Sequence, residues 1–207
     1  MKMDAVKQND VISMILDGLA DRGFAIADQF LPDSILENLF EEQKLLLEEG
    51  RFKEAGIGRG SEHSVRQEIR GDKILWFDPE NLSPFQEIYL FKLYDLKSRI
   101  TADFFLSLND IECHFAVYPV GSLYKRHLDQ FKGVGARQIS CILYLNKDWK
   151  EEDGGSLRIY YDVEDREKYI DVLPQWGRFV CFRSADIYHE VLKTNRERYS
   201  ITAWMRK

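Results

Sequence analysis

The chemistry that this sequence could support centres on four residues in its second half. His127 and Asp129 form a His-x-Asp pair, and residues two apart in an extended chain point to the same side. His189 lies near the start of a later strand-like run, and Arg198 opens the next one. Two imidazoles and one carboxylate bind non-haem iron(II) and leave coordination positions open to other molecules. The pattern therefore predicts an iron site.

Each of these residues has a simpler explanation when it is taken alone. The His-x-Asp pair could be a surface hydrogen bond, His189 a strand-end histidine bonded to a backbone carbonyl, and Arg198 an exposed charge. Zinc suits the set less well, because it usually takes four ligands, often with cysteine, and no cysteine stands beside these residues. Their combination in one region of alternating hydrophobicity favours the iron site.

The strand that begins at Arg198 adds a second function to the predicted site. A guanidinium is planar and permanently charged, so it matches the distal carboxylate of a dicarboxylate cosubstrate. Arg198, Ser200, Thr202 and Trp204 alternate along the strand and share one face. The Thr202 hydroxyl could therefore donate a hydrogen bond to the same carboxylate.

The first half of the chain must supply helices that support this region. Helical spacing of apolar residues predicts three helices, over about 10–23, 32–50 and 83–105. Asp10 is a candidate cap for the first. The third has the clearest start, because Ser83 can cap it, Pro84 stands in the first turn and Gln86 would complete a capping box.

From residue 111 onward the pattern is typical of short strands. The strand-like runs are 111–119, 137–146, 156–161, 168–173, 177–182 and 198–204. A short strand is also expected over 23–27, and residues 67–76 resemble two strand pieces joined at a turn. Helices followed by many short strands predict an α+β protein with a sandwich or barrel core, in one domain of residues 1–207 with helical support mainly over 10–105 and the β core mainly over 111–205.

The composition excludes several classes of protein. The 207 residues carry a formal net charge of −6, which argues against a large nucleic-acid interface. No apolar run is long enough to span a bilayer, and the polar start lacks the apolar core of a signal peptide. Cys113, Cys141 and Cys181 lie apart in apolar runs, which predicts buried reduced thiols. We therefore expect a cytoplasmic protein that binds neither membranes nor nucleic acid.

Several segments share a pattern with known proteins. They are Ile69-Arg70-Gly71-Asp72-Lys73-Ile74-x-Trp76, Tyr118-Pro119, Tyr124-x-Arg126-His127-x-Asp129, Cys141-Ile142-x-Tyr144-Leu145-Asn146-Lys147-Asp148-Trp149, Gly154-Gly155-x-Leu157-Arg158-Ile159, His189-Glu190-Val191 and Arg198-Tyr199-x-Ile201-Thr202-x-Trp204. Together they resemble the prolyl 4-hydroxylases of the iron(II)- and 2-oxoglutarate-dependent oxygenase superfamily. The resemblance is strongest to the oxygen-sensing branch that acts on hypoxia-inducible factor.

The resemblance implies a fold and an activity. The fold is a double-stranded β-helix, or jelly roll, with the helices packed outside it. The activity is hydroxylation of a prolyl residue at C4 in a protein substrate. The enzyme would bind iron(II) and consume 2-oxoglutarate and O2, with ascorbate as an optional reductant. Succinate and CO2 are the coproducts.

The resemblance also implies roles for residues at matching positions. The metal ligands are His127, Asp129 and His189; 2-oxoglutarate is held by Arg198 with help from Tyr144 and Thr202; Tyr118, Leu157 and Trp204 line or adjoin the metal pocket; Arg70 and Arg137 lie on the substrate side. The segment 56–72 matches a mobile loop that closes over the substrate peptide. Arg70 and Asp72 could instead simply pair with each other, and Tyr144 and Leu157 could be plain core residues.

Two departures from the animal enzymes limit the resemblance. His114 falls where those enzymes have an apolar pocket residue, so it is either a structural histidine or an extra imidazole near the metal. The chain also lacks the N-terminal zinc-binding module of one animal relative, which favours a bacterial or simple eukaryotic form. A bacterial form makes a translation elongation factor, not hypoxia-inducible factor, the candidate substrate.

Other functions are open at this point. A related oxygenase could act on a small molecule such as a free amino acid. A non-catalytic relative could bind iron and 2-oxoglutarate as a sensor, and a cupin-like barrel would bind no metal at all. The glycine-rich segment and Arg70 favour a peptide substrate, because a mobile cover suits an extended partner.

Overall fold

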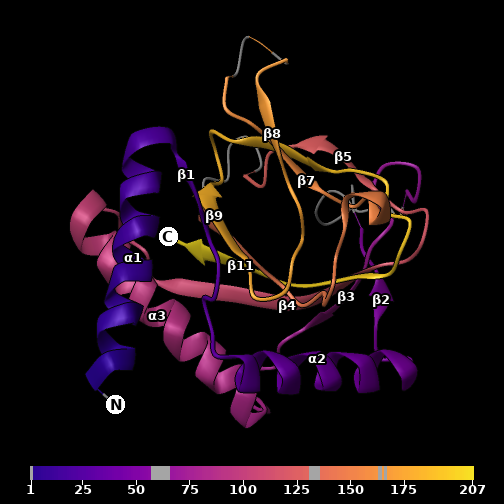
Figure 1. Ribbon diagram of the computed structural model, residues 1–207, viewed down its shortest axis with the longest axis horizontal. Helices are drawn as coiled ribbons and strands as arrows, with labels where there is room; N and C mark the ends of the chain where they lie inside the picture. The colour runs from indigo at the N-terminus through magenta and orange to yellow at the C-terminus, as the bar shows by residue number, and fades with distance from the viewer. Residues whose placement is uncertain (1, 57–65, 131–135, 163–164, 166) are drawn as a thin grey trace.

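The computed structural model describes residues 2–56, 66–130, 136–162, 165 and 167–207. In this part of the chain, three α-helices lie on one side of a large antiparallel sheet and a smaller antiparallel sheet lies on the other (Figure 1). The helices are α1 (Lys2–Arg22), α2 (Asp33–Glu48) and α3 (Pro84–Phe104). None of them is long and apolar enough to cross a membrane.

The start of α3 shows how the sequence sets a helix boundary. Ser83 is the N-cap, its hydroxyl accepts a hydrogen bond from the backbone N–H of Gln86 (3.2 Å), and Pro84 is the first helical residue. The second half of the predicted capping box is wrong, because the Gln86 amide donates to Glu42 of α2 instead (2.6 Å). The predicted cap at Asp10 is also wrong, since α1 begins at Lys2.

The seven-stranded sheet has the strand order β1-β9-β6-β11-β4-β3-β2. Its strands are β1 (Phe24–Ala27), β9 (Phe179–Arg183), β6 (Arg137–Tyr144), β11 (Arg198–Arg206), β4 (Asp110–Tyr118), β3 (Lys73–Trp76) and β2 (Lys53–Glu54). One face packs on the helices, where Ile201, Ala203 and Met205 of β11 join the larger apolar core. The other face turns toward the small sheet and forms one wall of a cavity.

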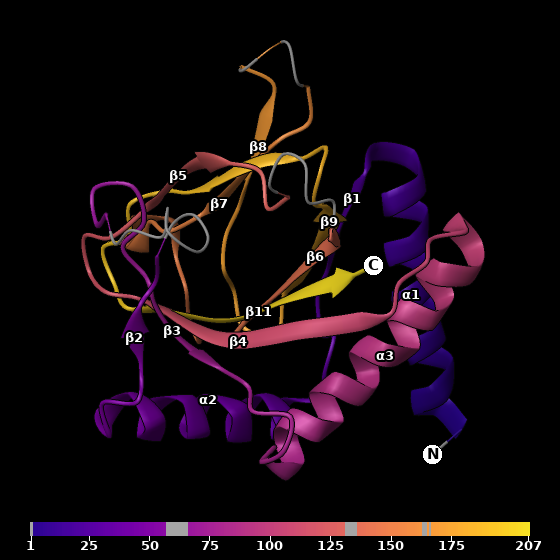
Figure 2. The ribbon, with the colours of Figure 1, turned by 180° about the vertical axis from the view of Figure 1, so that it is seen from behind.

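The four-stranded sheet has the order β5-β10-β7-β8. Its strands are β5 (Tyr124–His127), β10 (Tyr188–Val191), β7 (Leu157–Tyr160) and β8 (Tyr169–Val172). Leu157, Ile159 and Val191 from this sheet pack against Tyr144 and Val180 from the large sheet in a second apolar core. From β4 to β11 the chain crosses repeatedly between the two sheets, except that β7 and β8 are neighbours in the small sheet, so residues far apart in sequence meet across the space between the sheets (Figure 2).

Most of the predicted elements are present. The six predicted strand runs correspond to β4, β6, β7, β8, β9 and β11, and the short strand over 23–27 is β1. The expected strand pair over 67–76 is half wrong, because residues 67–69 form a turn and only the second piece is a strand, β3. Most of the glycine-rich segment, residues 57–65, lies outside the described residues.

Candidate metal centre and active site

Three side chains from the small sheet and the turn after it meet at one point. His127 ends β5, and His189 is its directly opposed partner on β10. Asp129 follows two residues after His127, and its carboxylate oxygens lie 3.6 Å from His127 Nε2 and 3.7 Å from His189 Nε2. One ligand atom from each of the three residues can be chosen so that all lie within 4.8 Å of one another, which fits a single metal ion.

Hydrogen bonds fix the orientation of both imidazoles. His127 Nδ1 lies 2.8 Å from the carbonyl oxygen of Lys125, and His189 Nδ1 lies 3.1 Å from that of Ile187. A carbonyl only accepts, so each Nδ1 carries the proton and each Nε2 lone pair faces the common point. This is the tautomer that a metal-binding histidine needs.

Asp129 is held on its other side by two serines of the large sheet region. Ser140 Oγ donates to Asp129 Oδ2 at 2.7 Å and lies 2.8 Å from Ser184 Oγ. Burial opposes ionisation of Asp129, but His189, His127 and the Ser140 hydroxyl together hold its pKa well below the usual range. Burial lowers the pKa of His189 to about 4, with His127 adding to the effect. The carboxylate is therefore ionised and His189 neutral at neutral pH, as metal binding requires.

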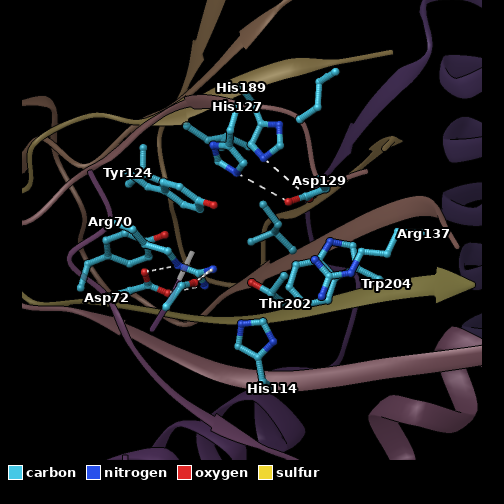
Figure 3. Close-up of a pocket in the computed structure, with 16 residues that line it drawn as sticks. Arg70, Asp72, His114, Tyr124, His127, Asp129, Arg137, His189, Thr202 and Trp204 are labelled. Atoms are coloured by element: carbon cyan, nitrogen blue, oxygen red, sulfur yellow. Dashed lines mark hydrogen bonds and ion pairs between the residues drawn. The ribbon is translucent and has the colours of Figure 1, made fainter. Parts of the chain in front are cut away.

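The three ligands open onto a cavity of about 140 Å³ between the two sheets (Figure 3). Its lining includes the ligands and, among the predicted site residues, Arg70, Tyr118, Arg137, Leu157, Thr202 and Trp204. The donor set, two imidazole nitrogens and one carboxylate on one side with space on the other, fits iron(II) with positions left for other ligands.

Arg198 and Tyr144 lie behind the cavity wall, not in its lining. The Arg198 guanidinium is buried, 5.0 Å from the ring centre of Tyr118 and 4.8 Å from that of Tyr144. Its Nε donates to the carbonyl of Gly155 (2.8 Å), while its Nη2 and the Tyr144 hydroxyl are buried without a hydrogen-bond partner. No carboxylate of the described chain pairs with this guanidinium. A buried charge of this kind calls for an anionic ligand.

Comparison with known proteins identifies the family. The model of the "2OG-Fe(II) oxygenase superfamily" matches residues 113–206. The crystal structure of a Pseudomonas putida prolyl-4-hydroxylase is 38% identical, with a TM-score of 0.84, over 95% of this chain and 98% of that one. The chain belongs to the 2-oxoglutarate- and iron(II)-dependent oxygenase superfamily. The predicted jelly-roll fold and the resemblance stated from the sequence motifs are thereby confirmed.

The chain is also similar to two further proteins. One is a Trichoplax adhaerens prolyl hydroxylase in complex with a hypoxia inducible factor oxygen degradation domain peptide fragment. It is 27% identical with a TM-score of 0.86, over 100% of this chain and 93% of that one. The other is Egl nine homolog 1 of Rattus norvegicus, 30% identical over 93% of this chain. The chain spans 58% of that protein and about half of its human and mouse counterparts.

The two arginines predicted for the substrate side, Arg70 and Arg137, are both engaged by acids. Arg70 makes a two-point hydrogen bond with the Asp72 carboxylate (2.7 and 2.9 Å) and lies over the Tyr124 ring. Burial opposes the charge of Arg70, yet Asp72 raises its pKa. Arg137 bonds Glu112 (3.2 Å) and stacks on Trp204 at 3.4 Å from the ring centre. The alternative pairing of Arg70 with Asp72 is thus present, within the cavity wall.

Tyr124 was missed as a candidate site residue. It stacks on His127 with ring centres 3.6 Å apart and lines the cavity. Tyr124 pairs with Val191 while His127 pairs with His189, so three steps on β5 face two on β10, a β-bulge. Strict alternation would place residues three apart on opposite faces. The extra residue brings both rings to one side, and the sequence pattern does not reveal it.

Proposed function

We propose that this oxygenase hydroxylates a prolyl residue at C4 in a protein substrate. The single observation that carries the proposal is a ready metal centre on a cavity that has a buried unpaired guanidinium behind its wall, in a chain similar over nearly its whole length to a prolyl-4-hydroxylase. When bound, iron(II), 2-oxoglutarate and O2 supply the oxidant, which puts one oxygen atom on proline and the other on succinate as CO2 is released.

The residues of the chain divide this work into binding and positioning. His127, Asp129 and His189 hold the iron. Arg198 binds the distal carboxylate of 2-oxoglutarate by donating a hydrogen bond from its unpartnered Nη2. The Tyr144 hydroxyl, which also lacks a partner, donates to the same carboxylate. With the cosubstrate bound, the Arg198 Nη2 and the Tyr144 hydroxyl each have a hydrogen-bond partner.

The remaining wall residues shape the cavity around the substrate. Thr202 is available as a further donor toward the cosubstrate, and Tyr118, Leu157 and Trp204 exclude water from the reacting centre. Arg70 and Arg137 flank the opening as groups that face the substrate polypeptide. Their acid partners neutralise them, so we propose that they recognise it by shape and hydrogen bonding, not as free charges.

We also propose that residues 1–207 form a single domain, because the helices and both sheets share adjoining cores. The protein is cytoplasmic, which its free buried Cys113, Cys141 and Cys181 support. A translation elongation factor is the first candidate substrate to test.

The test is turnover of proline-containing sequences by the iron-loaded protein. A peptide library and the candidate elongation factor are incubated with 2-oxoglutarate, and mass spectrometry follows the gain of one oxygen atom. We expect hydroxylation at proline, with succinate formed in equal amount and no mark on matched peptides with alanine in place of proline. Hydroxylation of free amino acids alone, or iron and 2-oxoglutarate binding without any turnover, would refute the proposal.

A further inference from the structure

His114 stands on the cavity wall opposite the metal ligands. It projects from β4 of the large sheet, whereas His127 and His189 project from the small sheet (Figure 3). Only 1% of His114 is exposed to solvent. Its ring packs against two tryptophans, with ring centres 4.7 Å from Trp76 and 5.1 Å from Trp204, and the two indoles lie 6.1 Å from each other. It is a component of the cavity lining and not of the apolar core beneath the sheet.

The polar atoms around this position have no partners. His114 Nδ1 is buried and makes no hydrogen bond with any described residue, and the same is true of the Trp204 indole Nε1. Burial lowers the pKa of His114 well below its usual range, and Arg70 and Arg137 lower it further while Asp129 opposes them. The neutral imidazole has one N–H donor and one nitrogen acceptor, and its buried Nδ1 has no partner among the described residues. A buried nitrogen without one destabilises the protein.

The position of His114 along its strand separates it from the cosubstrate anchor. Arg198 pairs with Tyr118 at one end of β4, and Thr202 pairs with His114 four residues further along. That spacing corresponds to roughly 13 Å along a strand, so His114 does not lie beside the guanidinium that anchors the distal carboxylate. Trp76, the strand neighbour of His114 on the other side, is 47% exposed. His114 therefore lies toward the outer end of the cavity, where a polypeptide would enter.

We propose that His114 hydrogen-bonds the backbone of the substrate polypeptide beside the target proline. This rests on the proposed function. A peptide unit presents a carbonyl acceptor and, after the proline, an N–H donor, which together match either tautomer of a neutral imidazole. Trp204, which packs against the imidazole and lines the same cavity, offers an apolar ring against which a pyrrolidine ring can pack. His114 is thus a substrate-binding residue, in a position where the resemblance implies an apolar one.

The test compares H114M with H114Q, using the library peptide that the wild-type protein hydroxylates most efficiently. Methionine fills a similar volume without hydrogen bonds, while glutamine keeps a donor and an acceptor. H114M should raise the KM for the peptide roughly tenfold, the effect of one hydrogen bond. The KM for 2-oxoglutarate and the peptide-independent decarboxylation rate should stay unchanged, and H114Q should recover part of the peptide affinity. C113A, on the opposite face of β4, is the matched control and should behave as wild type.

A modified peptide locates the bond. In this peptide an ester replaces the amide after the target proline, which removes the N–H and weakens the carbonyl acceptor. The wild-type protein should lose affinity for it, and H114M, which lacks the bond, should lose less. An unchanged peptide KM in H114M, a rise in the 2-oxoglutarate KM instead, or equal ester effects in both proteins would overturn the proposal. If no peptide is hydroxylated by the wild-type protein, the proposed function itself fails, which is a separate outcome.

Discussion

The two walls of the cavity differ in how their polar atoms are satisfied. On the small-sheet side, the Nδ1 atoms of His127 and His189 are each bonded to the carbonyl of the residue two positions earlier, and Asp129 is bonded to Ser140. On the large-sheet side, Tyr144 and Arg198 each present a buried polar atom without a partner, as do His114 and Trp204.

The difference separates a metal site that is complete in the protein from binding sites that ligands complete. A prearranged ligand set loses little conformational entropy when the ion binds. Unpartnered buried groups destabilise the empty protein but favour the ligand that satisfies them. We therefore expect substitutions of the metal ligands and of the residues bonded to them to affect metal affinity, and substitutions of the unpartnered groups on the large-sheet side to affect cosubstrate and substrate affinity.

Substitution of a metal-binding residue is expected to have the largest effect. H127A and D129A should abolish succinate formation, because two ligands hold iron(II) too weakly in a site built for three. Circular dichroism should show the fold intact. The matched control is K125A, which keeps the backbone carbonyl that orients His127 and should leave turnover unchanged. Undiminished turnover in either ligand variant would remove these residues from the metal centre.

Acidification tests the small-sheet side of the cavity in the metal-free protein. A histidine in the unfolded chain has a pKa of about 6.5, whereas that of native His189 is about 4. The unfolded state therefore binds more protons between these values, and stability is lost as the pH falls through that window. We expect His189 to contribute about 3 kcal/mol to this loss in the metal-free protein.

Urea titrations at several pH values measure this loss. His114, whose pKa is also well below the usual range, acts in the same direction. The slope of unfolding free energy against pH should therefore decrease in H189N and decrease further in H114M/H189N. A slope that is equal in all three proteins would show that these histidines titrate normally in the folded state.

Substitution of Arg198 tests cosubstrate binding on the large-sheet side of the cavity. R198M should raise the KM for 2-oxoglutarate by roughly 10- to 100-fold, the range for a hydrogen bond to a charged group. Metal affinity should not change. The melting temperature should not fall, because methionine replaces a buried charge that has no acid partner in the described chain. R196M, at an exposed arginine nearby, is the control; an unchanged cosubstrate KM in R198M would refute the role.

Ser140 gives the smallest expected effect. S140A removes the hydroxyl that donates to Asp129 Oδ2, and loss of such a contact to a metal ligand lowers affinity by about tenfold. Equilibrium binding of Mn²⁺ measures this directly. S184A, one bond further from the carboxylate, should weaken binding less. If S140A raised the 2-oxoglutarate KM at saturating metal but left metal affinity unchanged, the division between the walls would be wrong.

The sequence was informative where local residue type decides the outcome. The alternation that predicts β4, β6 and β11 is a burial pattern, and His127, Asp129 and His189 are recognisable because few side chains bind iron. The short strand β5 was not among the predicted runs, because Tyr124-Lys125-Arg126-His127 is polar. It is held in place by pairing with β10, a contact distant in sequence.

Contacts between distant segments account for the other omissions. Ser140 supports Asp129 from a different strand, and Gln86 turns to Glu42 of α2 instead of capping its own helix. The environment of His114 depends on Trp76 and Trp204, which reach it from β3 and β11. None of these pairings leaves a local signal, since each is set by tertiary packing.

The place of β11 in the large sheet has a consequence for biosynthesis. This strand lies between β6 and β4, yet it leaves the ribosome after every other strand. Until it arrives, the sheet consists of two separate halves, β1-β9-β6 and β4-β3-β2, and the nascent chain has no continuous wall. Stalled or truncated chains that end before Arg198 would expose both inner edges to aggregation. The wall of the cavity can therefore form only after residues 198–206 have been synthesised.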